Sequence, residues 1–313
     1  MQNLSIMRYL IIVLMVFLII AGCRQDNQRV RQVDFSERAS DEGTQRDLNV
    51  ERKLKVAVSA MSSPRETFSY YEDIIRFISE KLDMTYEFHQ RRTYNEVNFM
   101  LETGQLDFAF ICTGAYVELN PDAGVQLLSI PVTSGKTVYQ AYVIVPEGSS
   151  ADGFADLKGL SFAYTDLLSN TGYLYTKYRL NEIGEDPNTF FSSTVFTNAH
   201  DVSIQMVSKG LIDGASVHGM VFDYLQLNEP ERVRGVRIIE ISDDYGIPPV
   251  VASSRMSDDL KAEVRVVLQN MHLDEQGRKL INNLLIDEFT DGDDADYDGV
   301  REMRSALKDK FPE

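Results

Sequence analysis

A short polar turn carries the residue types best suited to bind an anion. Ser169, Asn170 and Thr171 follow an apolar strand pattern and lead through Gly172 into a helix pattern. Their uncharged side chains can donate hydrogen bonds, and the first turn of a helix presents unpaired N–H groups with a partial positive charge. The turn therefore predicts a site for a phosphate-like group. Considered alone, it is explained at least as well by Ser169 or Asn170 simply capping the helix.

The elements that position this turn occur twice in the chain. Two segments start at Leu54 and Leu160, and 53 positions separate each start from an aspartate, Asp107 or Asp213. Each aspartate stands near the beginning of the last expected strand of its segment, at residues 106–112 and 212–217. Each segment shows a strand, a turn, an amphipathic helix, a second strand, a short helix and a final strand. The aligned positions also pair Gly104 with Gly210, Ser63 with Ser169, and Tyr94 with His200. The expected short helices cover residues 94–102 and 200–208, and the shared aspartates suggest a structural role.

The repeat predicts an α/β fold with two lobes. Each segment is a βαβαβ unit, which implies a mainly parallel sheet flanked by helices, with ligands bound beyond the carboxyl ends of the strands. The extended stretches 139–146 and 236–253 are expected to cross between the lobes as a hinge, and the helices after Asp258 are expected to return to the first lobe. The expected division is 1–22 signal peptide, 23–52 tether, 53–142 plus 247–313 lobe 1, and 143–246 lobe 2.

The N-terminal residues predict export and lipid attachment. An apolar run at residues 9–20 is shorter than the roughly 20 residues of a membrane-spanning helix and has the length of a secretory signal. It leads into Ala21, Gly22 and Cys23, which resembles the lipobox of bacterial lipoproteins, with lipid on Cys23. A signal anchor is the alternative. With Cys23 lipidated, Cys112 has no disulfide partner and is expected to be a buried small apolar residue.

Charge and motif content narrow the class of function. A formal net charge of −17 disfavours nucleic acid as a partner. The chain lacks a Gly-x-Ser-x-Gly elbow, a Walker loop and metal spacing among its histidines, so neither an enzyme nor a cofactor is expected. Asp294, Asp296 and Asp298 match the start of a calcium loop, but Ser305 stands where the bidentate Glu should be, so no metal is expected.

The combination of motifs resembles the phosphate/phosphite/phosphonate-binding family of ABC-transporter solute receptors. The resemblance runs through FADLKGLSFAYTD, SNTGYLY and AHDVSIQMVSKGLIDGASV, and through YNEVNFMLETGQLDFAFICTGAYV and DADYDGVREM. It implies the type 2 periplasmic-binding-protein fold and places the phosphonate oxygens on Ser169, Asn170 and Thr171. The commoner family pattern is Ser-Thr-Ser-Gly, so Asn170 and Thr171 depart from it while keeping hydrogen-bond donors. The family's His in its His-Asp pair falls on His200, which can donate to an oxyanion.

The same resemblance implies an aromatic wall on the first lobe. Tyr71 and Tyr116 are the candidates, although each could be ordinary core packing. Tyr139, at the start of the hinge, and His218, after the last repeat strand, complete the candidate ligand set. The expected protein is a monomeric, lipid-anchored receptor in the periplasm or at the cell exterior, which binds a small anion and delivers it to an ABC permease. The alternatives are a sensory or interaction lipoprotein of the same fold, or a receptor for sulfonate or another small organic ligand.

Overall fold

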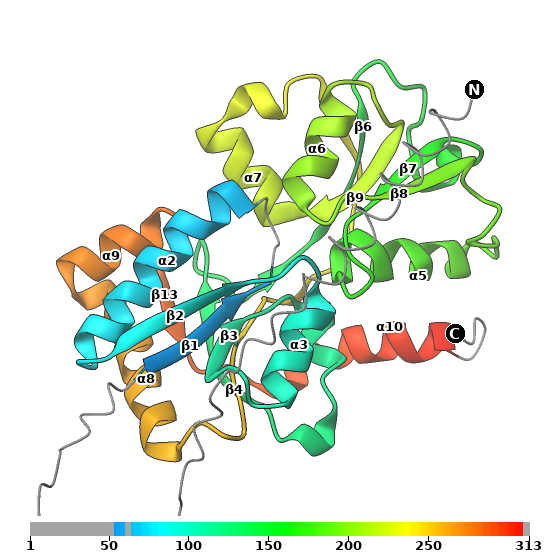
Figure 1. Ribbon diagram of the computed structural model, residues 1–313. Helices are drawn as coiled ribbons and strands as arrows, with labels where there is room; N and C mark the ends of the chain where they lie inside the picture. Colours follow the sequence, from blue (N-terminus) through cyan, green and yellow to red (C-terminus); the bar gives the residue numbers. More distant parts are fainter. Residues whose placement is uncertain (1–52, 60–63, 309–313) are drawn as a thin grey trace, which may run out of the picture. The chain divides into compact units, whose positions relative to one another are not determined.

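The computed structural model describes residues 53–59 and 64–308 (Figure 1). The signal peptide at 1–22, the tether at 23–52 and the lipid site at Cys23 lie outside the described residues and stay predictions. Among the described residues, no helix combines the length and apolar character needed to cross a membrane. The described residues all belong to one compact unit.

The first sheet is built around the first repeat. Its strand order is β13-β4-β12-β3-β1-β2, and β1 pairs in parallel with both β2 and β3. The strands from outside the repeat, β4, β12 and β13, join in antiparallel pairs. The bounds are β1 Lys53–Val58, β2 Thr85–Gln90, β3 Phe108–Phe110, β4 Gln126–Val132, β12 Val250–Ala252 and β13 Glu288–Thr290.

The second sheet repeats this plan. Its order is β10-β6-β9-β7-β8, with β7 parallel to β8 and β9 and with β6 and β10 added antiparallel. The bounds are β6 Ala141–Pro146, β7 Ser161–Tyr164, β8 Ser193–Phe196, β9 Gly214–His218 and β10 Val236–Ile241. The prediction of two lobes with parallel repeat strands is confirmed. The antiparallel strands come from the connecting stretches, which enter each sheet from the opposite direction.

The shared aspartates tie each repeat together. The Asp107 carboxylate accepts a hydrogen bond from the backbone N–H of Lys55 at 2.7 Å. In the second repeat the Asp213 carboxylate accepts from the N–H of Ser161 at 2.9 Å and from its hydroxyl at 2.6 Å. Each carboxylate therefore joins the end of its repeat to the start of its first strand, which agrees with the structural role expected from the repeat.

Two short strands lie where the chain passes between the sheets. β5 (Val138–Tyr139) and β11 (Tyr245–Gly246) pair with each other in antiparallel fashion. β5 lies between β4 of the first sheet and β6 of the second, and β11 lies between β10 of the second sheet and β12 of the first. The predicted hinge of two crossing strands is therefore present.

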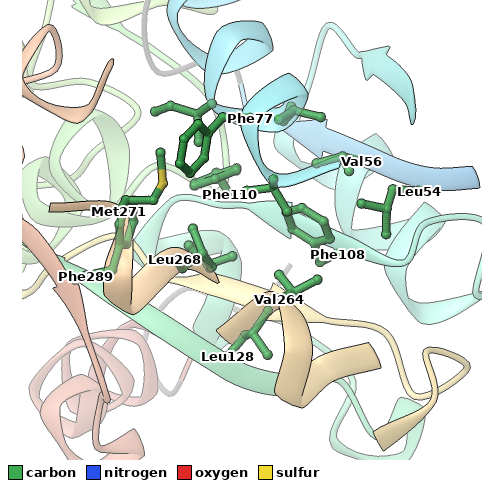
Figure 2. Close-up of a cluster of buried hydrophobic side chains, with 14 of the residues drawn as sticks. Leu54, Val56, Phe77, Phe108, Phe110, Leu128, Val264, Leu268, Met271 and Phe289 are labelled. Carbon is green, nitrogen blue, oxygen red and sulfur yellow. The ribbon is translucent and has the colours of Figure 1, made fainter. Parts of the chain in front are cut away.

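Helices from both ends of the chain cover the first sheet. The apolar face of α2 (Pro64–Lys81), with Ile74, Ile75 and Ile78 fully buried, packs with α8 (Asp258–Asn270) and α9 (Glu275–Asn282). Figure 2 shows the core beneath them, where Val264, Leu268 and Met271 meet side chains of the sheet strands. The helices α3 (Tyr94–Glu102) and α4 (Thr113–Val117) belong to the first repeat and to the segment directly after it.

The second sheet carries α5 (Tyr175–Glu182), α6 (His200–Ser208) and α7 (Gly219–Asn228), of which α6 and α7 contact β9. The last helix, α10 (Asp298–Lys308), contacts both α4 and α5. α8 and α9 do return to the first sheet, as expected, but α10 also contacts α5 of the second lobe. Short helical turns are η1 Pro121–Ala123, η2 Phe154–Leu157, η3 Asn170–Leu174, η4 Pro230–Arg232, η5 Met271–Leu273 and η6 Asp294–Tyr297. The four-part division of the chain stays a prediction.

Candidate functional site

The polar turn of the second repeat is fully buried and begins a helix. Ser169, Asn170 and Thr171 each have no solvent-exposed surface. Ser169 caps the helix, because its hydroxyl accepts a hydrogen bond from the N–H of Gly172 at 3.0 Å. The first turn, Asn170–Leu174, is a π-helix that continues into α5. π-Helical turns are rare in proteins, and those that occur are often found at functional sites. Ser169 therefore does cap the helix, as the simpler interpretation of the sequence predicts, and the turn also has the unusual backbone of a π-helix.

Gly172 is required by close packing at this turn. A Cβ atom on Gly172 would lie 1.8 Å from the Thr165 hydroxyl oxygen and 3.0 Å from Cε1 of His200. Thr165 directly follows β7, and His200 begins α6, so three elements converge on this glycine. Any side chain at this position would push apart the groups that surround the polar turn.

His200 is brought to the turn by the start of α6. Its Nδ1 accepts the N–H of His218 at 3.0 Å, which assigns the ring proton to Nε2. Nε2 then lies 3.4 Å from the Ser169 hydroxyl. Burial, and secondarily the neighbouring His218, holds the pKa of His200 well below its ordinary value. The ring is therefore a neutral hydrogen-bond donor at neutral pH.

His218 joins this group from the carboxyl end of β9. Its ring stacks on Tyr139 with centroids 4.2 Å apart, and the Tyr139 hydroxyl accepts from the Asn170 amide at 3.0 Å. Burial lowers the pKa of His218 to about 3, so this ring is neutral as well. Neither of its ring nitrogens has a hydrogen-bond partner in the described part of the chain.

Further buried polar atoms without partners gather on the same turn. Within the described residues they include Asn170 Oδ1, Thr171 Oγ1 and Thr165 Oγ1. The large majority of buried polar atoms in folded proteins are hydrogen-bonded, and leaving one unpaired costs about 1–3 kcal/mol. A concentration of such atoms around one helix start is what a binding site for a polar group requires.

The first lobe supplies the other side of this cluster. A Cβ atom on Gly114 of α4 would lie 2.3 Å from the carbonyl oxygen of Leu168 and 2.6 Å from the nitrogen of Asn170. The N–H of Tyr94 donates to the Asp166 carboxylate at 3.1 Å, next to the same turn. Segments of both lobes therefore meet directly at the turn.

Two buried side chains from the first repeat were absent from the predicted site. The buried Tyr94 lies close to Ser169, and burial raises the pKa of its phenol well above its ordinary range. Burial also raises the pKa of the Cys112 thiol, while the N–H groups of Asn170 and Gly114 point toward its sulfur and act in the opposite direction. The repeat could have indicated both, because Tyr94 aligns with His200 and Cys112 aligns with His218.

The structure does not bring every candidate to the turn. Tyr71 packs edge-on against Phe110 at 5.0 Å and lines a separate apolar cavity, and burial raises its pKa to about 12. Tyr116 lies elsewhere, with its hydroxyl donating to the Asp294 carboxylate at 2.7 Å and its ring 4.6 Å from that of Tyr297. The candidates that come together at the polar turn are Ser169, Asn170, Thr171, Tyr139, His200 and His218.

The acidic loop near the C-terminus is held by internal contacts. Asp294 accepts from Arg301 at 2.5 Å as well as from Tyr116, and Asp298 accepts from Arg301 at 2.7 Å. Across the part of the chain that the structure describes, no group of three or more His, Cys, Asp or Glu side chains is arranged to hold a metal ion. These contacts give the acidic loop a structural explanation.

Comparison with known proteins identifies a family. The sequence model described as "ABC transporter, phosphonate, periplasmic substrate-binding protein" matches residues 56–297. A probable ABC transporter phosphite-binding protein of Prochlorococcus marinus is 24% identical over 165 residues, which cover 51% of this chain and 56% of that protein. A phosphate-import protein of Mycolicibacterium smegmatis is 24% identical over 260 residues, or 74% of this chain and 79% of the relative.

A solved structure shows the same fold. The binding-protein component of an ABC phosphonate transporter from Pseudomonas aeruginosa superposes with a TM-score of 0.76 at 21% identity, covering 81% of this chain and 86% of the other. This likeness confirms the predicted two-lobed fold.

Proposed function

The chain belongs to the family of periplasmic substrate-binding proteins of phosphonate ABC transporters, and on this premise we propose that its polar turn captures a small phosphorus oxyanion. Proteins of this family bind solutes and are not enzymes, and they act outside the cytoplasm. The proposed ligand class is phosphonate, phosphite or phosphate, held by Ser169, Asn170 and Thr171. His200 and His218 would add donors from the neighbouring elements.

One observation carries this proposal: neutral hydrogen-bonding groups without partners are concentrated around the start of a buried helix. Thr171 Oγ1 and both ring nitrogens of His218 are such groups. Tetrahedral oxyanions are well matched to helix N-termini, where N–H groups and hydroxyls replace water. The formal charge of −17 does not oppose binding, because local dipoles dominate at contact distance while exposed charges are screened within about 10 Å.

Binding is proposed to proceed by closure of the two lobes. The turn lies beneath Gly114 of the first lobe, so an anion must enter when the lobes separate. The contacts of Tyr94 with Asp166, and of the Thr113 hydroxyl with the carbonyl of Gly246 at 2.7 Å, then re-form. A ligand that touches both lobes shifts the population toward the closed form, which a permease can recognise.

The remaining parts of the proposal concern attachment and assembly. We propose that Cys23 carries lipid, that the mature chain is a tethered monomer, and that an ABC permease receives the ligand. The order of apolar run, small residues and cysteine supports lipidation. Replacing Cys23 with Ser should release the protein from the membrane fraction and remove the mass of the lipid from the intact protein. Retention on the membrane with an uncleaved N-terminus would favour the signal anchor instead.

The ligand proposal is tested by calorimetry on the purified whole chain. Phosphate, phosphite, methylphosphonate and 2-aminoethylphosphonate are titrated separately, and at least one is expected to bind with micromolar or tighter affinity. The double substitution Ser169→Ala with Thr171→Ala should weaken that affinity by about 100-fold, since two hydrogen bonds to a charged group are lost. Ser193→Ala with Thr194→Ala on the exposed strand β8 is the matched control and should leave affinity unchanged. Unchanged affinity in the first double variant would place the anion elsewhere.

A further inference from the structure

A second feature lies beside the polar turn: a cavity between the first sheet and α7. Its walls come from α2, β3 and β13 of the first sheet and from the start of α7, and its volume is about 110 Å³. The wall from the first lobe includes Tyr71, Phe110 and Phe289, and the wall from the second lobe includes Val221 of α7. Residues 247–249, which follow β11 of the hinge, complete the wall. The cavity therefore lies between parts that belong to different lobes.

The chemistry of this cavity is apolar. Apart from tyrosine hydroxyls and His218, the described residues that line it carry aliphatic, aromatic, proline or methionine side chains, and none of them is a Lys, Arg, Asp or Glu. Transferring an ammonium or a carboxylate from water into such surroundings is costly unless a counter-charge is present. An uncharged hydrocarbon group, by contrast, gains free energy in proportion to the apolar surface that is removed from water.

His218 is the residue that this cavity shares with the polar turn. Its side chain lines the cavity and is 3% exposed, and its two ring nitrogens have no partner among the described residues. On the other side, its ring lies 5.6 Å from that of His200 and stacks on Tyr139, which bonds to Asn170. One wall of the cavity is thus also one wall of the proposed anion site. A small ligand with an anionic head at the turn can extend past His218 into the cavity.

We infer that the ligand of this protein is a phosphonate with an uncharged apolar substituent larger than methyl, whose hydrocarbon part occupies the cavity. The inference rests on the proposed function and specifies the substrate class of the same site. In it, His218 donates to a phosphonate oxygen, while Tyr71, Phe110 and Val221 contact the substituent. Apolar cavities of roughly 150 Å³ hold a benzene molecule, so the smaller cavity of about 110 Å³ matches a chain of about four carbons.

Two matched ligand pairs test the inference on the purified whole chain by calorimetry. Propylphosphonate and 2-aminoethylphosphonate have the same shape and differ in the charge at the end of the substituent. Propylphosphonate should bind at least about 30-fold more tightly, because the ammonium group would lose its water without gaining a partner. Butylphosphonate and methylphosphonate differ in apolar area, and butylphosphonate should bind at least about tenfold more tightly.

The outcomes separate this inference from the proposed function. Equal affinities within both pairs, or tighter binding of the aminoethyl compound, would overturn the inference and leave the proposed function standing. Binding of phosphate or phosphite without binding of any phosphonate would do the same. If none of the phosphorus compounds binds, both the inference and the proposed function fail.

Substitutions on α7 locate the substituent. Val221→Phe should fill part of the cavity and weaken the binding of butylphosphonate by at least about tenfold, while the affinity for methylphosphonate changes by less than about threefold. Leu227→Phe on the same helix is the control, because Leu227 is 68% exposed and does not line the cavity. Val221→Asp is a second variant and is expected to gain affinity for a charged substituent. Its carboxylate supplies a counter-charge, so the affinity for 2-aminoethylphosphonate relative to that for propylphosphonate should rise by at least about tenfold. Unchanged preferences in both Val221 variants would place the substituent outside the cavity and overturn the inference.

Discussion

The two repeats of this protein share a scaffold and differ around the polar turn. Asp107 and Asp213 make the same backbone contacts at equivalent positions, 52 residues from their partners Lys55 and Ser161. The starts of the two short helices differ, however. α3 begins with a capping box made by Thr93 and Glu96, whereas α6 begins after Ala199 without a side-chain cap.

The two repeats also carry different side chains at equivalent positions around the polar turn. Tyr94 in the first repeat is aligned with His200 in the second, and Cys112 is aligned with His218. All four side chains are buried, but the two histidines bring neutral ring nitrogens to the Ser169 turn. Positions that are the same in both repeats maintain the fold, and positions that differ give the second repeat its polar site. The following predictions test this division, from the largest expected effect to the smallest.

The substitution of Gly114 is expected to have the largest effect, because this residue lies where the two lobes touch. Gly114→Ala places a methyl group against the Leu168 carbonyl and the Asn170 nitrogen, so the lobes cannot approach fully. Affinity for the ligand should fall by about 100-fold, or about 2.7 kcal/mol, as measured by calorimetry. Gly299→Ala in α10 is the control, since no atom lies within 4 Å of its added Cβ. A Gly114→Ala protein with unchanged affinity would show that closure does not need this contact.

The shared aspartates should both contribute to stability. Asp107→Ala and Asp213→Ala each remove an acceptor for a strand N–H and should lower the free energy of unfolding by about 2 kcal/mol in urea titrations. Ligand affinity of the folded protein should change little in either variant. A large loss of affinity confined to Asp213→Ala would contradict the assignment of both residues to the scaffold.

Acid sensitivity should belong to the second repeat. An unfolded His has a pKa near 6.5, while burial holds that of folded His218 at about 3. Between these values the unfolded chain binds the additional proton, so the free energy of unfolding decreases as the pH falls from about 6.5 to about 3. In urea titrations between pH 4 and 6, His218→Asn should reduce this dependence by about 1.4 kcal/mol per pH unit. Cys112→Ala, at the aligned position of the first repeat, should leave the pH dependence unchanged.

The capping box of α3 should have the smallest effect. Thr93→Ala removes the hydroxyl that accepts from the N–H of Glu96 at 3.3 Å and should lower the free energy of unfolding by about 1 kcal/mol. Ligand affinity should not change, because the hydrogen bonds between Thr93 and Glu96 are exposed to solvent. A loss of affinity without a loss of stability would assign a binding role to the start of α3 as well as to that of α6.

The sequence by itself determined the repeat, its elements and the central turn. Local patterns were sufficient, because strand alternation, helix periodicity and the glycines at helix ends depend on near neighbours; the helices at 94–102 and 200–208 were predicted with their observed bounds. The equal spacing of Asp107 and Asp213 from their strands also followed from the repeat. The family resemblance, more than the residues themselves, directed attention to His200.

Only the tertiary structure decided which side chains meet at the turn and what lies next to it. Tyr71 and Tyr116 look equivalent in the sequence, but one lines the cavity and the other bonds to Asp294. Gly114 and Leu168 are 54 positions apart, and their contact depends on how the lobes fold against each other. The physical reason is that a site between lobes is made by long-range packing, which no local pattern encodes. The polar turn was visible in the sequence, while the apolar cavity beside it, and hence the ligand class inferred for it, required the fold.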